Sequence, residues 1–240
     1  MLSRISVVAL AALVVAVPAA SAAPASSAVP VEGSTHSTHH VSPQPSDSSE
    51  FSASVDPVPE EYRDRMIGVS WEPGCPVPID DLRIITMNYR GFDGDVHDGG
   101  RLMVHKDVAD TTVTVFGEMF EEGFPIRRMQ LIEEYDGSDD ASMAADNTSS
   151  FNCRPITGSP GRFSIHSYGK AIDINTVENP YVKGDLVLPP SGEEFLDRDD
   201  VRPGMITKND PVVKAFKKRR FDWGGNWKSL KDYQHFEAKS

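Results

Sequence analysis

A histidine and an aspartate lie close together in the C-terminal half of the 240-residue chain, at His166 and Asp173. If residues 171–175 form a strand, Asp173 projects from one face, while isoleucines on the other face anchor the strand in the core. Gly169 permits a turn that would fold His166 back toward Asp173. An imidazole and a carboxylate held together suit zinc, which binds nitrogen and oxygen donors at about 2 Å. This spacing alone also occurs by chance, so a structural role for both residues is the alternative.

A second motif near the C-terminus contains Asp232 and His235. His235 would complete a set of two histidines and one aspartate with a fourth position open for water, which is the arrangement of a catalytic zinc site. Asp232 would lie beside the same metal if the segment makes one turn, and it would then accept a proton from water. Other chemistries lack their motifs, because the chain has no His-Glu-x-x-His, no Gly-x-Ser-x-Gly and too few cysteines for a four-thiolate site.

Together these motifs resemble the VanY-type D-alanyl-D-alanine carboxypeptidase family of zinc peptidases, which also contains L-alanyl-D-glutamate endopeptidases. The shared signature is Ser-x-His-x-x-Gly-x-Ala-x-Asp, here residues 164–173, followed by a distal Asp/Glu-x-x-His, here residues 232–235. The resemblance extends over about residues 81–237. The flanking segments that also match are Phe151–Arg154, Asn179–Tyr181 and Phe221–Trp227.

The resemblance implies a role for each matched residue. The implied zinc ligands are His166, Asp173 and His235. Asp232 would be the general base, and Arg154 would stabilise the oxyanion that develops on the substrate. The positions that would orient a ligand or line the cleft are Ser164, Trp223 and Trp227. For both tryptophans, a place in the core is an equally good interpretation.

We therefore expect one zinc ion and hydrolysis of peptidoglycan stem peptides, with a D-alanyl-D-alanine carboxypeptidase as the preferred reading. An L-alanyl-D-glutamate-type endopeptidase is the first alternative. The second is a zinc-stabilised binding module without turnover, as in Hedgehog-type signalling domains, although such a binder has no need of a base at Asp232. A carboxypeptidase must also neutralise the terminal carboxylate of its substrate, and Arg162 is a candidate by position only, with a surface arginine as the alternative.

Several segments carry the patterns of strands. Branched and aromatic residues at Leu82–Asn88 and Arg101–Lys106, between stretches rich in Gly and Asp, predict two strands joined by a turn. Met129–Tyr135 predicts another strand. His105 falls in the second strand, where a lone histidine usually has a structural role.

Two segments predict helices. Between Val108 and Glu122, apolar residues recur on one helical face, with Asp107 as a candidate cap and Gly123 as a stop. Residues 210–220 predict a second helix, which begins with an Asp-Pro pair and ends in basic residues that complement the helix dipole. Strands and helices mix without βαβ alternation. The predicted class is therefore α+β, a single domain with a small, mostly antiparallel sheet and helices packed on one side.

The N-terminal region predicts export. Residues 1–22 combine a basic start, an apolar run too short to span a bilayer and small residues that suit cleavage after Ala22, which together indicate a signal peptide. An uncleaved anchor is the alternative. Residues 23–57 are rich in Ser, Pro and Ala and predict a disordered linker. The linker histidines, which we exclude from the site, are His36, His39 and His40. Residues 58–240 would form the peptidase domain.

Composition limits the partners. The net charge of −12 argues against nucleic acid and against broad electrostatic docking on anionic wall polymers, so that substrate recognition has to be local. The two cysteines, Cys75 and Cys153, would form one disulfide in an oxidising compartment, with two separate thiols as the alternative. We expect a secreted, cell-wall-associated monomer without a membrane span after signal cleavage.

Overall fold

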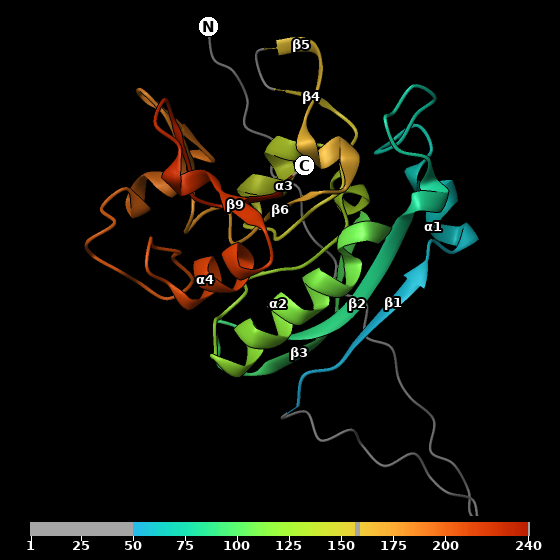
Figure 1. The fold of residues 1–240 in the computed structure, drawn as a ribbon. Coiled ribbons are helices and arrows are strands. Elements are labelled where there is room, and N and C mark those ends of the chain that lie inside the picture. Colours follow the sequence, from blue (N-terminus) through green and yellow to red (C-terminus); the bar gives the residue numbers. More distant parts are fainter. Residues whose placement is uncertain (1–49, 157–158, 240) are drawn as a thin grey trace, which may run out of the picture. The chain divides into compact units, whose positions relative to one another are not determined.

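The structure is a computed structural model that describes residues 50–156 and 159–239 (Figure 1). The strands are β1 Ala53–Pro57, β2 Leu82–Arg90, β3 Val96–His105, β4 Pro155–Ile156, β5 Ser159–Phe163, β6 Ala171–Asp173, β7 Tyr181–Lys183, β8 Leu186–Leu188, β9 Phe221–Trp223, β10 Lys231–Asp232 and β11 His235–Ala238. The α-helices are α1 Glu60–Met66, α2 Ala109–Glu121, α3 Asp139–Ala144 and α4 Pro211–Lys218. Short 3₁₀ helices are η1 Ile79–Asp81, η2 Lys106–Val108, η3 Ile132–Tyr135, η4 Ile165–Tyr168, η5 Pro190–Phe195 and η6 Gly224–Asn226. The predicted signal peptide and the linker histidines His36, His39 and His40 lie outside the described residues.

The first sheet has the antiparallel order β1-β2-β3. The strands β2 and β3 confirm the two strands predicted around residues 82–88 and 101–106. β1 lies inside the predicted linker, so that the folded region begins earlier than expected. The side-chain amide of Asn88 explains the difference, since it accepts a hydrogen bond from the N–H of Ser52 and donates one to the carbonyl of Glu50, both at 2.8 Å.

Both faces of this sheet are buried. Side chains of β2 alternate, so that Ile85 and Met87 belong to one hydrophobic cluster and Leu82 and Ile84 to another. The first cluster also contains the buried faces of α2, α4, β6, β9 and β11, whereas the second lies under α1 and η1. The sheet therefore separates the site-bearing strands from the N-terminal helical segment.

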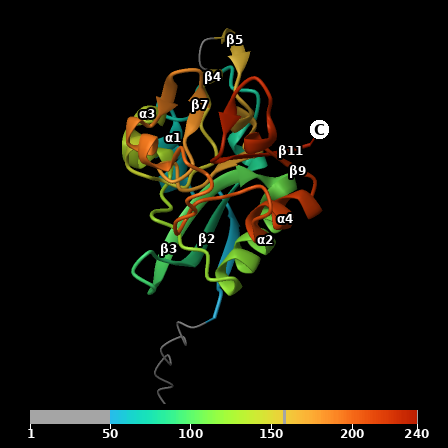
Figure 2. The ribbon, with the colours of Figure 1, turned by 90° about the vertical axis from the view of Figure 1, so that its left-hand side faces the viewer.

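The helices α2 and α4 pack beside the sheet. α2 covers one face of β2, and α4 lies alongside α2 (Figure 2). Both predicted helices are confirmed, and the Asp210 carboxylate caps α4 by accepting from the N–H of Val212. The predicted capping by Asp107 is wrong, because η2 precedes α2 and the ring of His105 instead accepts from the N–H of Asp107. His105 thus has the structural role that was expected of it.

The predicted strand over Met129–Tyr135 is wrong. Met129 forms a single bridge with Thr148, and the chain then turns into η3. The reason lies in the side chain of Asn147, which accepts a hydrogen bond from the N–H of Gln130 and donates one to its carbonyl, both at 2.9 Å. A side chain therefore occupies the backbone groups that a neighbouring strand would have paired.

The sheet that carries the site has the order β6-β11-β9, with β11 in the middle. The register places His235 directly opposite Asp173 and Phe236 opposite Ile172. Ile172 and Phe236 are buried in the first hydrophobic cluster, and the Phe236 ring stacks on Phe216 of α4 at 4.0 Å between centroids. Because these apolar residues face the core, Asp173 and His235 lie side by side on the opposite face of the sheet.

Two further small sheets complete the described part, a β10-β7-β8 sheet and a β4-β5 hairpin. All strand pairs are antiparallel, which confirms the α+β class, although the strands are divided among several small sheets instead of one. The predicted disulfide is present between Cys75 and Cys153. Among the described residues, no helix has both the length and the apolar character that crossing a bilayer requires.

Candidate metal centre and active-site cleft

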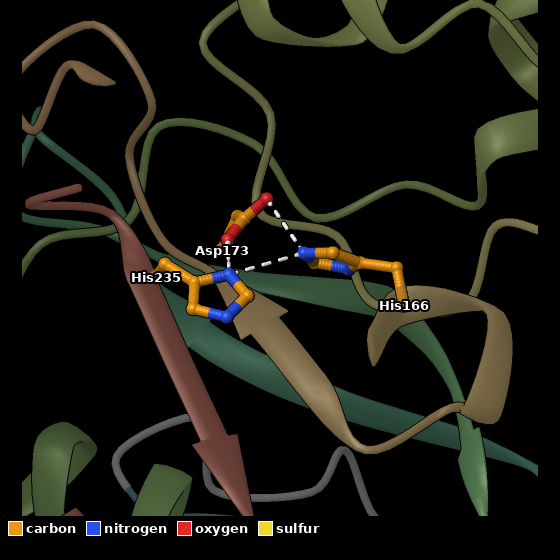
Figure 3. Close-up of side chains that lie close together, drawn as sticks. All are labelled: His166, Asp173 and His235. Atoms are coloured by element: carbon orange, nitrogen blue, oxygen red, sulfur yellow. Dashed lines mark hydrogen bonds and ion pairs between the residues drawn. The ribbon is translucent and has the colours of Figure 1, made fainter. Parts of the chain in front are cut away.

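Three side chains from separate segments converge on one point, as Figure 3 shows. The Nε2 atom of His166 lies 3.2 Å from Nδ1 of His235 and 3.1 Å from Oδ2 of Asp173. Nδ1 of His235 lies 3.0 Å from Oδ1 of Asp173. All three residues are buried, and their donor atoms lie within 4.8 Å of one another. The structure thus brings together the three residues that the sequence assigns to a metal.

Local structure turns His166 toward this point. His166 lies in η4, which ends at Gly169 in the left-handed conformation with φ 63°. A side chain at Gly169 would also be excluded by space, because a Cβ there would lie 2.6 Å from the backbone nitrogen of His105. Ser164 caps η4 by accepting from the N–H of His166 at 3.3 Å. Ser164 therefore positions the backbone of the histidine, not its imidazole ring.

The outer nitrogen of each imidazole is also bound. Nδ1 of His166 donates to the backbone carbonyl of Ser150 at 2.6 Å, which leaves Nε2 facing the centre. Nε2 of His235 lies 3.2 Å from the Glu237 carboxylate, which leaves Nδ1 facing the centre. Metal-binding histidines commonly have such outer partners, which fix the ring and the tautomer. The sequence reasoning missed Glu237, although its place two residues after His235 on the same face of a strand was a usable signal.

The donor set fits a zinc ion. Ligands that surround zinc tetrahedrally at about 2 Å lie about 3.3 Å from one another. The three donor separations of 3.0, 3.1 and 3.2 Å come close to this value. Two imidazoles and one carboxylate are also a donor set that zinc accepts in catalytic sites. Three such ligands leave one tetrahedral position for water or substrate.

Attraction between the Asp173 carboxylate and the two imidazoles dominates the electrostatics of the centre. Burial alone would raise the pKa of the Asp173 carboxyl, but His166 and His235 outweigh burial and lower this pKa well below its usual value. Burial would lower the pKa of His235, but its hydrogen bonds with Asp173 and Glu237 raise this pKa to about 10. A metal ion that binds Nδ1 therefore has to displace a proton, so that metal uptake releases protons.

Asp232 lines the same cavity as the three clustered residues. It ends β10, and a bend at Tyr233 and Gln234 connects it to β11. Its Oδ1 atom is buried and has no hydrogen-bond partner among the described residues. Burial raises the pKa of Asp232 to about 7, which suits an acid–base group at neutral pH. Gly224 permits this placement, because a Cβ there would lie 2.6 Å from the Asp232 carbonyl oxygen.

Arg154 also reaches the cavity, and Asp139 binds its guanidinium. The distance from Nη2 of Arg154 to Oδ2 of Asp139 is 2.7 Å, and the Nε atom of Arg154 is buried without a partner among the described residues. The arginine follows the disulfide-bonded Cys153, and its backbone N–H donates to Ser167 Oγ at 2.9 Å. Asp139 had no signal in the sequence, because it lies on α3, outside every recognised motif.

The cavity beside the centre has a volume of about 220 Å³. Trp227 lines it, with its ring 5.3 Å from the His235 ring between centroids. Trp223 does not line it, since this residue is 5% exposed in the core and its indole N–H donates to the Tyr233 carbonyl. Of the two tryptophans, only Trp227 therefore belongs to the cleft. The remaining apolar walls are formed by Met143, Ile156, Ile165, Leu188 and Leu230.

Arg162, the candidate partner for a substrate carboxylate, does not line this cavity. It lies on β5 and lines a neighbouring cavity instead. Within the site cavity, the cationic side chain is Arg154, and the amide of Gln234 is a neutral donor nearby.

Residues 157–238 match the model of a peptidase family described as D-alanyl-D-alanine carboxypeptidase. The matched segment contains the three clustered residues and Asp232, whereas Arg154 precedes it. No solved structure was found to match the chain. The family match confirms the resemblance seen in the sequence over this part of the chain.

Proposed function

We propose that this relative of the D-alanyl-D-alanine carboxypeptidases is a zinc-dependent carboxypeptidase that removes terminal residues from peptidoglycan stem peptides. The observation that carries the proposal is the convergence of His166, Asp173 and His235 beside the buried carboxylate of Asp232. A pure binding module needs three ligands but has no need of a base in the same cavity. The family match supports the peptidase class and the substrate.

In the proposed reaction, His166, Asp173 and His235 would hold a zinc ion, which would act as a Lewis acid by lowering the pKa of water and polarising the scissile carbonyl. Asp232 accepts the proton of the attacking water and returns it to the leaving amine. Arg154 donates to the oxygen that becomes negatively charged, through nitrogen atoms that Asp139 does not occupy. Trp227 and the aliphatic walls exclude bulk water from this region.

We also propose that the protein is exported and acts as a monomer on the cell wall. Support comes from the predicted signal peptide in the sequence and from the disulfide between Cys75 and Cys153, since such bonds persist in oxidising compartments. Cell fractionation, with N-terminal sequencing of the mature protein, tests export and cleavage after Ala22. Size-exclusion chromatography with light scattering tests whether the protein is a monomer.

One observation favours an internal cut instead, as in an L-alanyl-D-glutamate endopeptidase. A carboxypeptidase has to neutralise the terminal carboxylate of its substrate, and Arg162 lies outside the site cavity. Arg154 would then have to serve both the carboxylate and the oxyanion, or Gln234 would have to contribute. An endopeptidase has no such requirement.

Mass spectrometry of digested muropeptides separates the two functions. The zinc-loaded protein is incubated with purified pentapeptide muropeptides, with the Asp232→Asn variant as the inactive control. Loss of one terminal D-alanine supports the carboxypeptidase, whereas an internal cut supports the endopeptidase. A protein that retains one zinc ion and releases neither product from these muropeptides would contradict both functions and favour the binding module.

A further inference from the structure

A second cavity, of about 870 Å³, adjoins the site cavity. Ile165 lines both cavities. The strand β11 also connects them, because His235 and Glu237 line the site cavity, whereas Ala238 and Lys239 line the second one. Nothing in the chemistry proposed above uses this second cavity.

The charge of the second cavity is opposite to that of the whole chain. The chain carries a net charge of −12, yet the cavity has a single carboxylate, Asp107, among its lining residues. The cationic side chains that line it are Arg162, Lys170, Arg219, Arg220 and Lys239. Such a local excess of positive charge attracts anions even on an acidic protein.

Two of these cations are available for a ligand. Lys170 pairs with Asp107 at 3.2 Å, Arg219 with a carboxylate of α2 at 2.6 Å, and Lys239 with one of β9 at 2.9 Å. Arg162 and Arg220 have no ion pair with any other residue in the described ranges. Both are exposed at the cavity wall.

Large hydrophobic side chains stand beside these cations. Phe163, Ile165 and Tyr168 are 41%, 38% and 37% exposed, and all three line the second cavity. Exposed apolar side chains grouped at one place commonly mark a binding surface. Apolar walls beside free guanidinium groups suit a peptide that carries both aliphatic side chains and a carboxylate.

We propose that the second cavity is an extended subsite that binds a carboxylate of the same stem peptide whose scissile bond lies at the metal centre. This inference rests on the proposed function. The four-residue step from His235 to Lys239, the residue after β11, corresponds to about 13 Å if it stays extended. About three to four residues of an extended peptide span that distance, so that one stem peptide can occupy both cavities. A glutamate of the stem peptide supplies the carboxylate.

A phosphate polymer of the wall is the competing ligand. Ile165, which lines both cavities, and the apolar walls favour the peptide, because a polyphosphate is bound mainly through cations and gains little from aliphatic contacts. Three of the five cations are also already paired within the protein, which leaves the guanidinium groups of Arg162 and Arg220 for a ligand carboxylate.

The test uses zinc-loaded Asp232→Asn protein, which is expected to bind substrate without cleaving it, and isothermal titration calorimetry. Two synthetic pentapeptides end in D-Ala-D-Ala and differ only in D-glutamate or D-glutamine at the second position. We expect the D-glutamate peptide to bind about tenfold more tightly, with a difference that shrinks at high salt. Adding Arg162→Gln and Arg220→Gln should abolish the difference. The matched control adds Lys183→Gln and Lys208→Gln, two exposed lysines outside both cavities, and should retain it.

The outcomes are distinct. Equal binding of both peptides by the Asp232→Asn protein would overturn the subsite and leave the proposed function intact. A preference that survives Arg162→Gln with Arg220→Gln would likewise overturn it. If short polyglycerol phosphate displaced the D-glutamate peptide and bound more tightly than it, this result would assign the cavity to the wall polymer and overturn the proposal that it binds a stem peptide. Failure of both peptides to bind would refute the proposed substrate and the subsite with it.

Discussion

Replacement of Arg154 by alanine gives the sharpest test of the proposed chemistry. The guanidinium reaches the cavity but is not a metal ligand, so that Arg154→Ala should remove a transition-state contact and leave the metal centre intact. Loss of one oxyanion donor typically costs about 3–4 kcal/mol. At about 1.4 kcal/mol for each factor of ten, kcat should fall by about 10²–10³.

The same change has a cost in stability that can be separated from catalysis. Arg154 and Asp139 are 23% and 26% exposed, so removal of the arginine leaves a mostly buried carboxylate without its partner. We expect the free energy of unfolding to fall by about 1–3 kcal/mol. Adding Asp139→Asn should recover part of this stability without recovering turnover. Arg65→Ala, which breaks an exposed ion pair on α1, is the control for charge loss and should leave kcat unchanged.

The assay combines kcat and KM for a D-Ala-D-Ala peptide with zinc content by mass spectrometry and with denaturant unfolding. A bound zinc content near one, together with the fall in kcat, supports the oxyanion role. Loss of zinc in the Arg154→Ala protein would show that the arginine supports the metal instead. A fall in kcat of less than about tenfold at full zinc content would refute the role outright.

Three further changes test other parts of the structure. Asp232→Asn should lower kcat by about 10²–10⁴ at unchanged zinc content, and near-normal turnover would remove Asp232 from the mechanism. Burial and the neighbouring carboxyl group of Asp146 raise the pKa of Glu178 from 4.5 to about 8. The folded chain then holds this proton more tightly than the unfolded chain, and the free energy of unfolding should fall as pH rises from 4.5 to about 8. Glu178→Gln should remove this part of the pH dependence in denaturant titrations. If the free energy of unfolding of the variant and of the unchanged protein varied with pH in the same way, the raised pKa of Glu178 would be contradicted. Changing Cys75 and Cys153 to serine should cost about 4 kcal/mol of stability, and a loss below about 1 kcal/mol in denaturant titrations would show that the disulfide contributes little.

The sequence predicts the metal centre because local rules position its residues. Strand alternation determines the face of Asp173, and the left-handed turn at Gly169 determines the direction of His166. Both rules act within a few residues, so that they can be applied without knowledge of the fold. For the distant His235 the residues give only a candidate ligand, and the family resemblance supports the assignment, because the pairing of His235 with β6 spans more than sixty residues of chain.

What the sequence does not reveal depends on contacts between distant segments. Asp139 meets Arg154 only through the placement of α3. The side chain of Asn147 prevents a strand after Met129 by hydrogen bonding to the backbone of Gln130. No local sequence pattern indicates these hydrogen bonds. The basic cavity is equally hidden, because its cations come from β5, from the residue before β6, from the end of α4 and from the residue after β11, and they meet only in the folded chain.

The central position of β11 has a consequence for the behaviour of the protein without the proposed zinc ion. His235 belongs to a strand that is hydrogen-bonded on both sides and held from beneath by the Phe236–Phe216 stack. The ligands therefore have their scaffold independently of the ion, unlike a zinc finger, in which the ion creates the fold. Treatment with a chelator should switch the activity off while the chain stays folded, and added zinc should restore it, so that metal supply could control the enzyme reversibly.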